Sequence, residues 1–95
     1  MTYLDLLASK IELLIPRDLL PAENARPLFR LYAVLALAKG TAVEAMDVHN
    51  AWAAWMQEQD PEHRSIKPFG ELDIATQTSD EPFAQAIREV AKHIN

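Results

Sequence analysis

The chain has 95 residues, a formal net charge of −5 and no cysteine, which together predict one domain without disulfides, in a reducing compartment such as the cytoplasm. A hydrophobic content of 49% excludes a disordered composition. Nine basic residues are scattered among fourteen acidic ones, and no apolar run is long enough for a membrane span, so we expect neither a nucleic-acid partner nor a membrane partner.

The N-terminal part predicts an amphipathic helix followed by a single turn. Thr2 and Asp5 have the spacing of a capping box, with Asp in place of the usual Glu, and apolar residues then recur every three or four positions as far as Leu14. Pro16 ends this helix. The segment PRDLLP that follows is too short for a full helix, so one turn is expected there.

A second helix is expected to begin between residues 24 and 27 and to contain the nearly continuous apolar run 28–38. A helix that is apolar on all sides is typical of a buried core position. We therefore predict that this is the buried, central helix of the core. Lys39-Gly40 is a typical C-terminal stop, because glycine tolerates the left-handed conformation that often ends a helix.

A third helix is predicted over 44–58, with its apolar arc formed by Ala45, Val48, Trp52, Trp55 and Met56. Asp60-Pro61 ends it. The segment 61–79 has no clear helical period and is predicted to be a long ordered loop, either a functional one or one with short structure of its own. A last helix follows over 82–94, with Ser79 or Asp80 as its cap. The fold class predicted is all-α, a bundle of four main helices with a long ordered loop before the last.

The two tryptophans are the first candidates for a binding site. Trp52 is either an aromatic platform for a ring-shaped ligand or a core residue, since it shares its helix face with Val48 and Met56. Trp55 is predicted to belong to the core. His49 precedes Trp52 by one turn, at the edge of the apolar arc, where it either contacts a ligand or bonds a nearby carbonyl.

The most basic stretch of the chain is His63, Arg64 and Lys67. With His49 these residues offer donors that suit a phosphate or carboxylate group. The alternative is a solvated loop, because acidic residues flank the stretch on its N-terminal side. The histidines lack metal-ligand spacing, and no hydrolase triad or glycine-rich phosphate loop is visible, so we predict no metal, no cofactor and no catalysis.

Three features follow one another between Val48 and Ile94: His49-x-x-Trp52, then His63-x-x-Ile66-x-Pro68-Phe69-x-x-Leu72, then Asp80. With these features the segment resembles the repeat domain of ryanodine receptors, which also occurs in bacterial and phage proteins. The family's Gly-Trp-x-Tyr-Gly stretch is missing here, and Arg64 stands where members carry proline. The resemblance divides the single domain 1–95 into a helical addition, 1–43, and a repeat-like module, 44–95. The chain also resembles small proteins of actinobacteria and their phages.

The resemblance implies a non-catalytic module that recognises or sequesters a nucleotide-derived signalling molecule. Trp52 would then supply stacking, with His63, Arg64 and Lys67 as phosphate donors and with His49 and Phe69 shaping the wall of the pocket. The alternative is a protein-interaction adaptor, in which the helices at 2–14 and 82–94 pack on a partner or on a second copy to form a homodimer or higher oligomer.

Overall fold

The computed structural model describes residues 1–21 and 23–94, and all regular secondary structure in those residues is helical. The helices are α1 (Tyr3–Leu13), α2 (Ala25–Lys39), α3 (Ala45–Gln59), the short α4 (Ile74–Thr78) and α5 (Glu81–Ala91), with the single 3₁₀ turns η1 (Arg17–Leu19), η2 (Gly40–Ala42) and η3 (Phe69–Glu71) between them. The predicted all-α class with four main helices is therefore confirmed. In the described residues no helix combines the length and apolar character that crossing a membrane requires.

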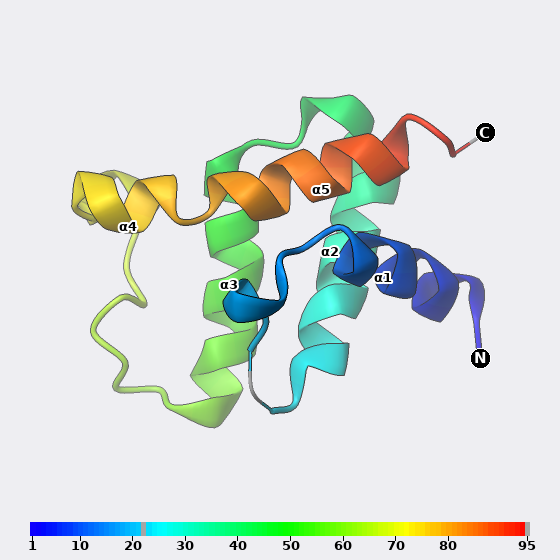
Figure 1. Ribbon diagram of the computed structural model, residues 1–95. Helices are drawn as coiled ribbons and strands as arrows, with labels where there is room; N and C mark the ends of the chain where they lie inside the picture. Colours follow the sequence, from blue (N-terminus) through cyan, green and yellow to red (C-terminus); the bar gives the residue numbers. More distant parts are fainter. Residues whose placement is uncertain (22, 95) are drawn as a thin grey trace.

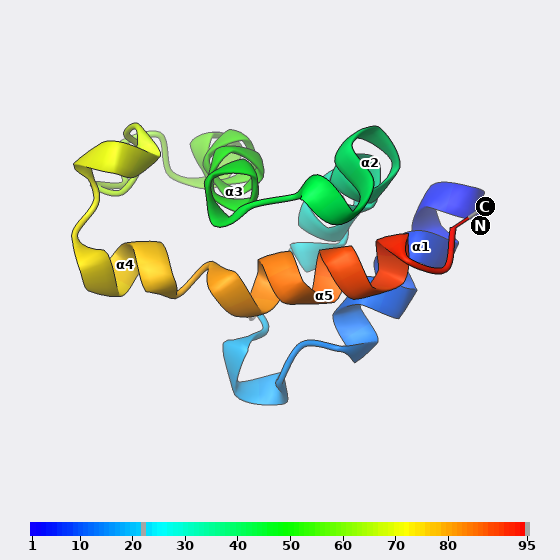
Figure 2. The ribbon, with the colours of Figure 1, turned by 90° about the horizontal axis from the view of Figure 1, so that it is seen from above.

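The antiparallel helices α2 and α3 lie side by side, and α5 crosses both of them (Figure 1). Figure 2 shows α2 and α3 nearly end-on, with α5 running along one side of the pair. α1 packs along α2 and also contacts α5. The core fills the space between these four helices, and its largest fully buried side chains are Tyr32, Phe29, Ile11, Leu28, Ile87, Val43 and Val48.

The predicted capping box at the start of α1 is confirmed. The Asp5 N–H donates to Thr2 Oγ1 at 3.4 Å, and the Thr2 N–H donates to Asp5 Oδ2 at 3.3 Å. Arg30 Nε on α2 also donates to Asp5 Oδ1, at 2.8 Å. This hydrogen bond is the main reason why the pKa of Asp5 falls to about 2. One carboxylate therefore both caps α1 and ties it to α2.

α2 packs against α1, α3 and α5, as expected of a central helix, but the prediction that it is buried holds for only part of its surface. α1 and the α3–α5 pair cover two sides of α2, but Val34 and Leu37 on another side are 47% and 45% exposed. A bundle of this size has too few helices to surround any one of them on all sides. The predicted stop is confirmed, because α2 ends at Lys39 and Gly40 has a φ of +58°.

The segment 61–79 is an ordered connection with short structure of its own, as one of the two alternatives predicted, and this structure is η3 and α4 (Figure 1). Asp73 caps this helix by accepting the Thr76 N–H at 2.8 Å. The side-chain amide of Gln77 donates to the carbonyls of Phe69 and Leu72, at 3.0 and 3.1 Å. These polar contacts, rather than an apolar face, hold α4 in place, so a search for apolar periodicity does not find it.

Candidate functional site

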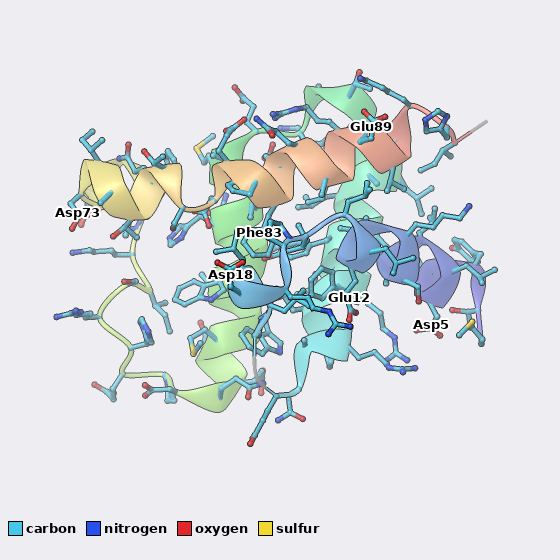
Figure 3. The ribbon with its side chains drawn as sticks, viewed as in Figure 1. Asp5, Glu12, Asp18, Asp73, Phe83 and Glu89 are labelled. Atoms are coloured by element: carbon cyan, nitrogen blue, oxygen red, sulfur yellow. The ribbon has the colours of Figure 1, made fainter. Side chains whose placement is uncertain are left out.

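A partly enclosed cavity of about 310 Å³ lies where the segment after α1, α2, α3 and the start of α5 meet. Phe83 extends from α5 on the side that faces α2 and α3 (Figure 3), and its ring centroid lies 5.9 Å from that of Tyr32. The apolar part of the wall consists of Leu19, Pro21, Leu28, Trp52 and Phe83. A mostly apolar hollow with a few polar groups is the usual form of a small-molecule site.

His49 lies at the polar end of this cavity and is only 3% exposed. Its Nε2 lies 2.7 Å from the carbonyl oxygen of Lys67. Because a carbonyl oxygen can only accept, Nε2 must carry a proton. The sequence left open whether His49 contacts a ligand or a nearby carbonyl. In the structure His49 bonds a carbonyl, and it also lines the cavity. This bond fastens the connection between α3 and α4 to helix α3.

Asp80 faces His49 across the polar end of the cavity, with its Oδ2 4.0 Å from His49 Nδ1. This oxygen is buried, and no donor in the described residues forms a hydrogen bond with it. Burial raises the pKa of Asp80 to about 6, with a smaller opposing contribution from His49. A carboxylate oxygen that is removed from water without a donor is costly, so it marks a position that suits a ligand donor.

The predicted capping role of Asp80 is not what the structure shows. Asp80 occupies the N-cap position of α5, but its side chain accepts no capping hydrogen bond. Its backbone is helical, with φ −84° and ψ −15°, because α4 leads almost directly into α5. A capping side chain needs an extended backbone to fold back onto the first turn. The carboxylate is therefore directed into the cavity instead.

Trp52 is half-buried and contacts two imidazoles. Its ring is stacked with that of His49 at a centroid distance of 5.7 Å and an interplanar angle of 24°, and the ring of His63 meets it edge-on at 5.1 Å. The indole therefore packs against the core and also lines the cavity, and its role as a platform for a ligand stays a prediction. Trp55 is a core residue, as predicted, and its indole N–H donates to the Asn24 carbonyl at 2.9 Å.

His63 and Phe69 contact residues that line the cavity but do not line it themselves. His63 Nδ1 accepts the Ser65 N–H at 3.1 Å, which leaves this nitrogen without a proton and orients the ring against Trp52. The ring of Phe69 lies 6.1 Å from that of His49. Neither residue lines the 310 Å³ cavity, so both position the residues that do.

Arg64 and Lys67 line a second hollow, also of about 310 Å³, beside the first. The two hollows share Ser65 and Thr76 in their walls. Asp73 lies in the second hollow, and its pKa is lowered mainly by the hydrogen bonds from Thr76, with smaller contributions from the two cations. The structure thus brings His49 and Trp52 together in one cavity and places the cations in its neighbour.

The sequence analysis did not select Asp80, Tyr32 and Ser65 as site residues, although all three line the cavity. Asp80 had a signal, an acidic residue immediately before the last helix, but that signal is also typical of a cap. Tyr32 lies within an apolar run, so the sequence marks it only as a core residue. Burial raises the pKa of its hydroxyl. In the described residues no group of three potential ligands is arranged to hold a metal ion.

Comparison with known proteins gives a family but no function. No curated protein and no solved structure matches the chain. The match to a family model extends over residues 2–92 and thus includes both α1 and α2, which the ryanodine receptor resemblance left outside its module. Nothing in this match links the chain to the ryanodine receptor repeat, so that resemblance stays a prediction. The chain belongs to the family of proteins that share the domain of unknown function DUF7701.

Proposed function

We propose that this protein is a non-catalytic binding module for a nucleotide-derived small molecule, whose ring enters the cavity between α2, α3 and α5. The observation that carries the proposal is the buried Asp80 Oδ2, which has no donor in the described residues and lines an otherwise mostly apolar cavity. A flat heterocycle matches both features, because its faces are apolar and its edge carries N–H donors.

The neighbouring hollow supplies a place for the phosphate. Arg64 and Lys67 are exposed there, and Ser65 and Thr76 form the boundary between the two hollows. A ligand that crosses this boundary would have its ring at Asp80 and its anionic group at the two cations. The carboxylate of Asp73 partly offsets the positive charge, so the cations are expected to add moderately to the affinity.

The absence of catalysis is part of the proposal. Ser65, Thr76 and Ser79 bring hydroxyl groups to the cavity. In the described part of the chain, none of these hydroxyls forms a hydrogen bond with His49 or Asp80, as an activated nucleophile would with its base. The polar end of the cavity is therefore better suited to recognition than to acyl or phosphoryl transfer.

The test is calorimetric titration of the protein with a panel of nucleoside monophosphates and with the parent nucleosides. We expect at least one pair to bind, with the monophosphate tighter than the nucleoside. Replacing both Arg64 and Lys67 by alanine is expected to weaken the monophosphate roughly threefold to tenfold and to leave the nucleoside unchanged. The matched control replaces Lys10 and Arg26, exposed cations that line neither hollow. Failure of every compound to bind would contradict the proposal.

A second candidate function is self-association through α1. Several large apolar side chains of this helix and its C-terminal end are exposed, among them Leu6, Leu13 and Leu14, and Leu13 is 84% exposed. Beside them a groove of about 590 Å³ runs between α1 and α5. A contiguous exposed apolar surface of this kind is typical of a contact between copies.

Light scattering after size exclusion tests this second candidate. A homodimer is expected to give twice the monomer mass at high protein concentration, and Leu13→Asp is expected to return the mass to that of one chain. The exposed position of Leu13 means that the substitution should leave the core intact. If the wild-type protein has the mass of one chain at all concentrations, self-association is excluded.

A further inference from the structure

The hydrogen bond between His49 and Lys67 has a consequence for the ligand, because it determines what the other ring nitrogen can do. With the proton on Nε2, the neutral imidazole has a lone pair on Nδ1 and accepts hydrogen bonds there. Nδ1 is the atom that faces Asp80. The Lys67 carbonyl, which belongs to the connection between α3 and α4, thus determines that Nδ1 is an acceptor in the cavity.

The polar end of the cavity consequently presents two acceptors side by side. Asp80 Oδ2 and His49 Nδ1 lie 4.0 Å apart, too far for a hydrogen bond between them and with no donor on the carboxylate oxygen in the described residues. Two acceptors at this separation are not satisfied by a group that pairs one donor with one acceptor. They are complementary to two N–H donors on neighbouring atoms of a ring edge, one for each acceptor.

We infer that the cavity selects a ring whose edge carries two adjacent N–H donors, as the ring N–H and exocyclic amino group of guanine do. This inference rests on the proposed function and adds the class of base to it. An adenine edge offers a donor beside a ring acceptor, and that acceptor would face either the Asp80 carboxylate or the His49 lone pair. A buried acceptor placed against another acceptor loses its partner, so adenine is disfavoured.

Three aromatic side chains that line the cavity suit a flat ring. Tyr32 and Phe83 lie on the side of α2 and α5, and Trp52 lies on α3. The ring would lie among these aromatic side chains, with its donor edge toward Asp80. The phenol of Tyr32 keeps its proton, because burial raises its pKa.

The test is calorimetric titration with guanosine, inosine and adenosine. Inosine has the same ring N–H as guanosine but lacks the amino group. We expect guanosine to bind about tenfold or more tightly than inosine and adenosine to bind more weakly than either, in line with the cost of an unmade hydrogen bond to a charged group. Asp80→Asn is expected to weaken guanosine by a similar factor, because the amide presents an N–H to one of the ligand donors. Asp18→Asn, an exposed change on the segment that supplies Leu19 and Pro21 to the wall, is the control and should leave the affinity unchanged.

The outcomes separate this inference from the proposed function. If adenosine binds as tightly as guanosine, or if Asp80→Asn leaves guanosine binding unchanged, the inference is wrong while the binding function stands. If no nucleoside or nucleotide binds, both are overturned. The preference for guanosine together with its loss in Asp80→Asn is the result that supports the inference.

Discussion

Replacing Asp80 by asparagine is expected to raise the free energy of unfolding of the ligand-free protein by about 1–2 kcal/mol at pH 8. The side chain is 15% exposed, its Oδ2 has no donor in the described residues, and burial raises its pKa to about 6. Asparagine has nearly the same shape but carries no charge, and its amide can turn an N–H toward the His49 Nδ1 lone pair. A substitution within the cavity would therefore make the fold more stable.

The effect depends on pH, and its sign follows from the direction of the shift. The carboxyl of Asp80 has a usual pKa of 3.8 and a raised pKa of about 6 in the folded protein. Between these values the folded state holds a proton that the unfolded state has lost, so the contribution of Asp80 to stability falls as the pH rises through this window. The other titratable groups that face it, His49 from α3 and Tyr32 from α2, are present in both proteins.

Urea titrations of the two proteins between pH 4 and pH 8 measure this difference. We expect the two stabilities to be close at pH 4, to separate through pH 6 and to keep a constant difference above pH 7. Asp18→Asn removes an exposed carboxylate and is expected to change the stability by less than about 0.5 kcal/mol at every pH. An Asp80→Asn protein that is less stable than the wild type at pH 8 would show that the carboxylate has a donor after all.

Replacing His49 by leucine is expected to lower the free energy of unfolding by about 1–3 kcal/mol and to release the connection between α3 and α4. The imidazole is 3% exposed and its Nε2–H donates to the Lys67 carbonyl at 2.7 Å. Leucine fills a comparable volume, but it leaves that carbonyl without its donor. The ring contacts with Trp52 and Phe69 are also lost.

Hydrogen exchange followed by mass spectrometry measures the release, since the backbone between Asp60 and Asp73 should exchange faster while the core helices keep their relative order of protection. His49→Gln is the matched variant, because its amide N–H can reach toward the same carbonyl. It should recover part of the protection and of the stability. Equal exchange in the leucine variant and the wild type would mean that η3 and α4 hold the connection without His49.

The two substitutions are expected to change the stability of the protein in opposite directions. His49 is expected to stabilise the protein, because its ring donates a hydrogen bond to the connection between α3 and α4. Asp80 is expected to destabilise it, because its charge is buried without a donor. A residue that lowers the stability of the free protein, and lies in a cavity, is typical of a binding site whose ligand supplies the missing interaction.

The local elements were predictable where a short-range rule determines them. The capping box at Thr2, the stop at Gly40 and the core position of Trp55 follow from residue type and spacing, and the structure confirms each. The position of α4 was not predicted, because the amide of Gln77 and the cap at Asp73 hold this helix without an apolar face. The exposure of Val34 was missed because it depends on how many neighbours α2 has.

The sequence by itself determined the helical class, the helix boundaries to within a few residues and the placement of His49 and Trp52 on one helix face, because these depend on residues three or four positions apart. Only the tertiary structure decided that Asp80 joins them, since it lies 31 residues beyond His49 and is brought back by the crossing of α5 over α3. The tertiary structure also separated Arg64 and Lys67 from the indole of Trp52, because the Lys67 backbone is bonded to His49 while its side chain turns to the neighbouring hollow. Such pairings depend on how helices pack, and sequence spacing carries no record of that packing.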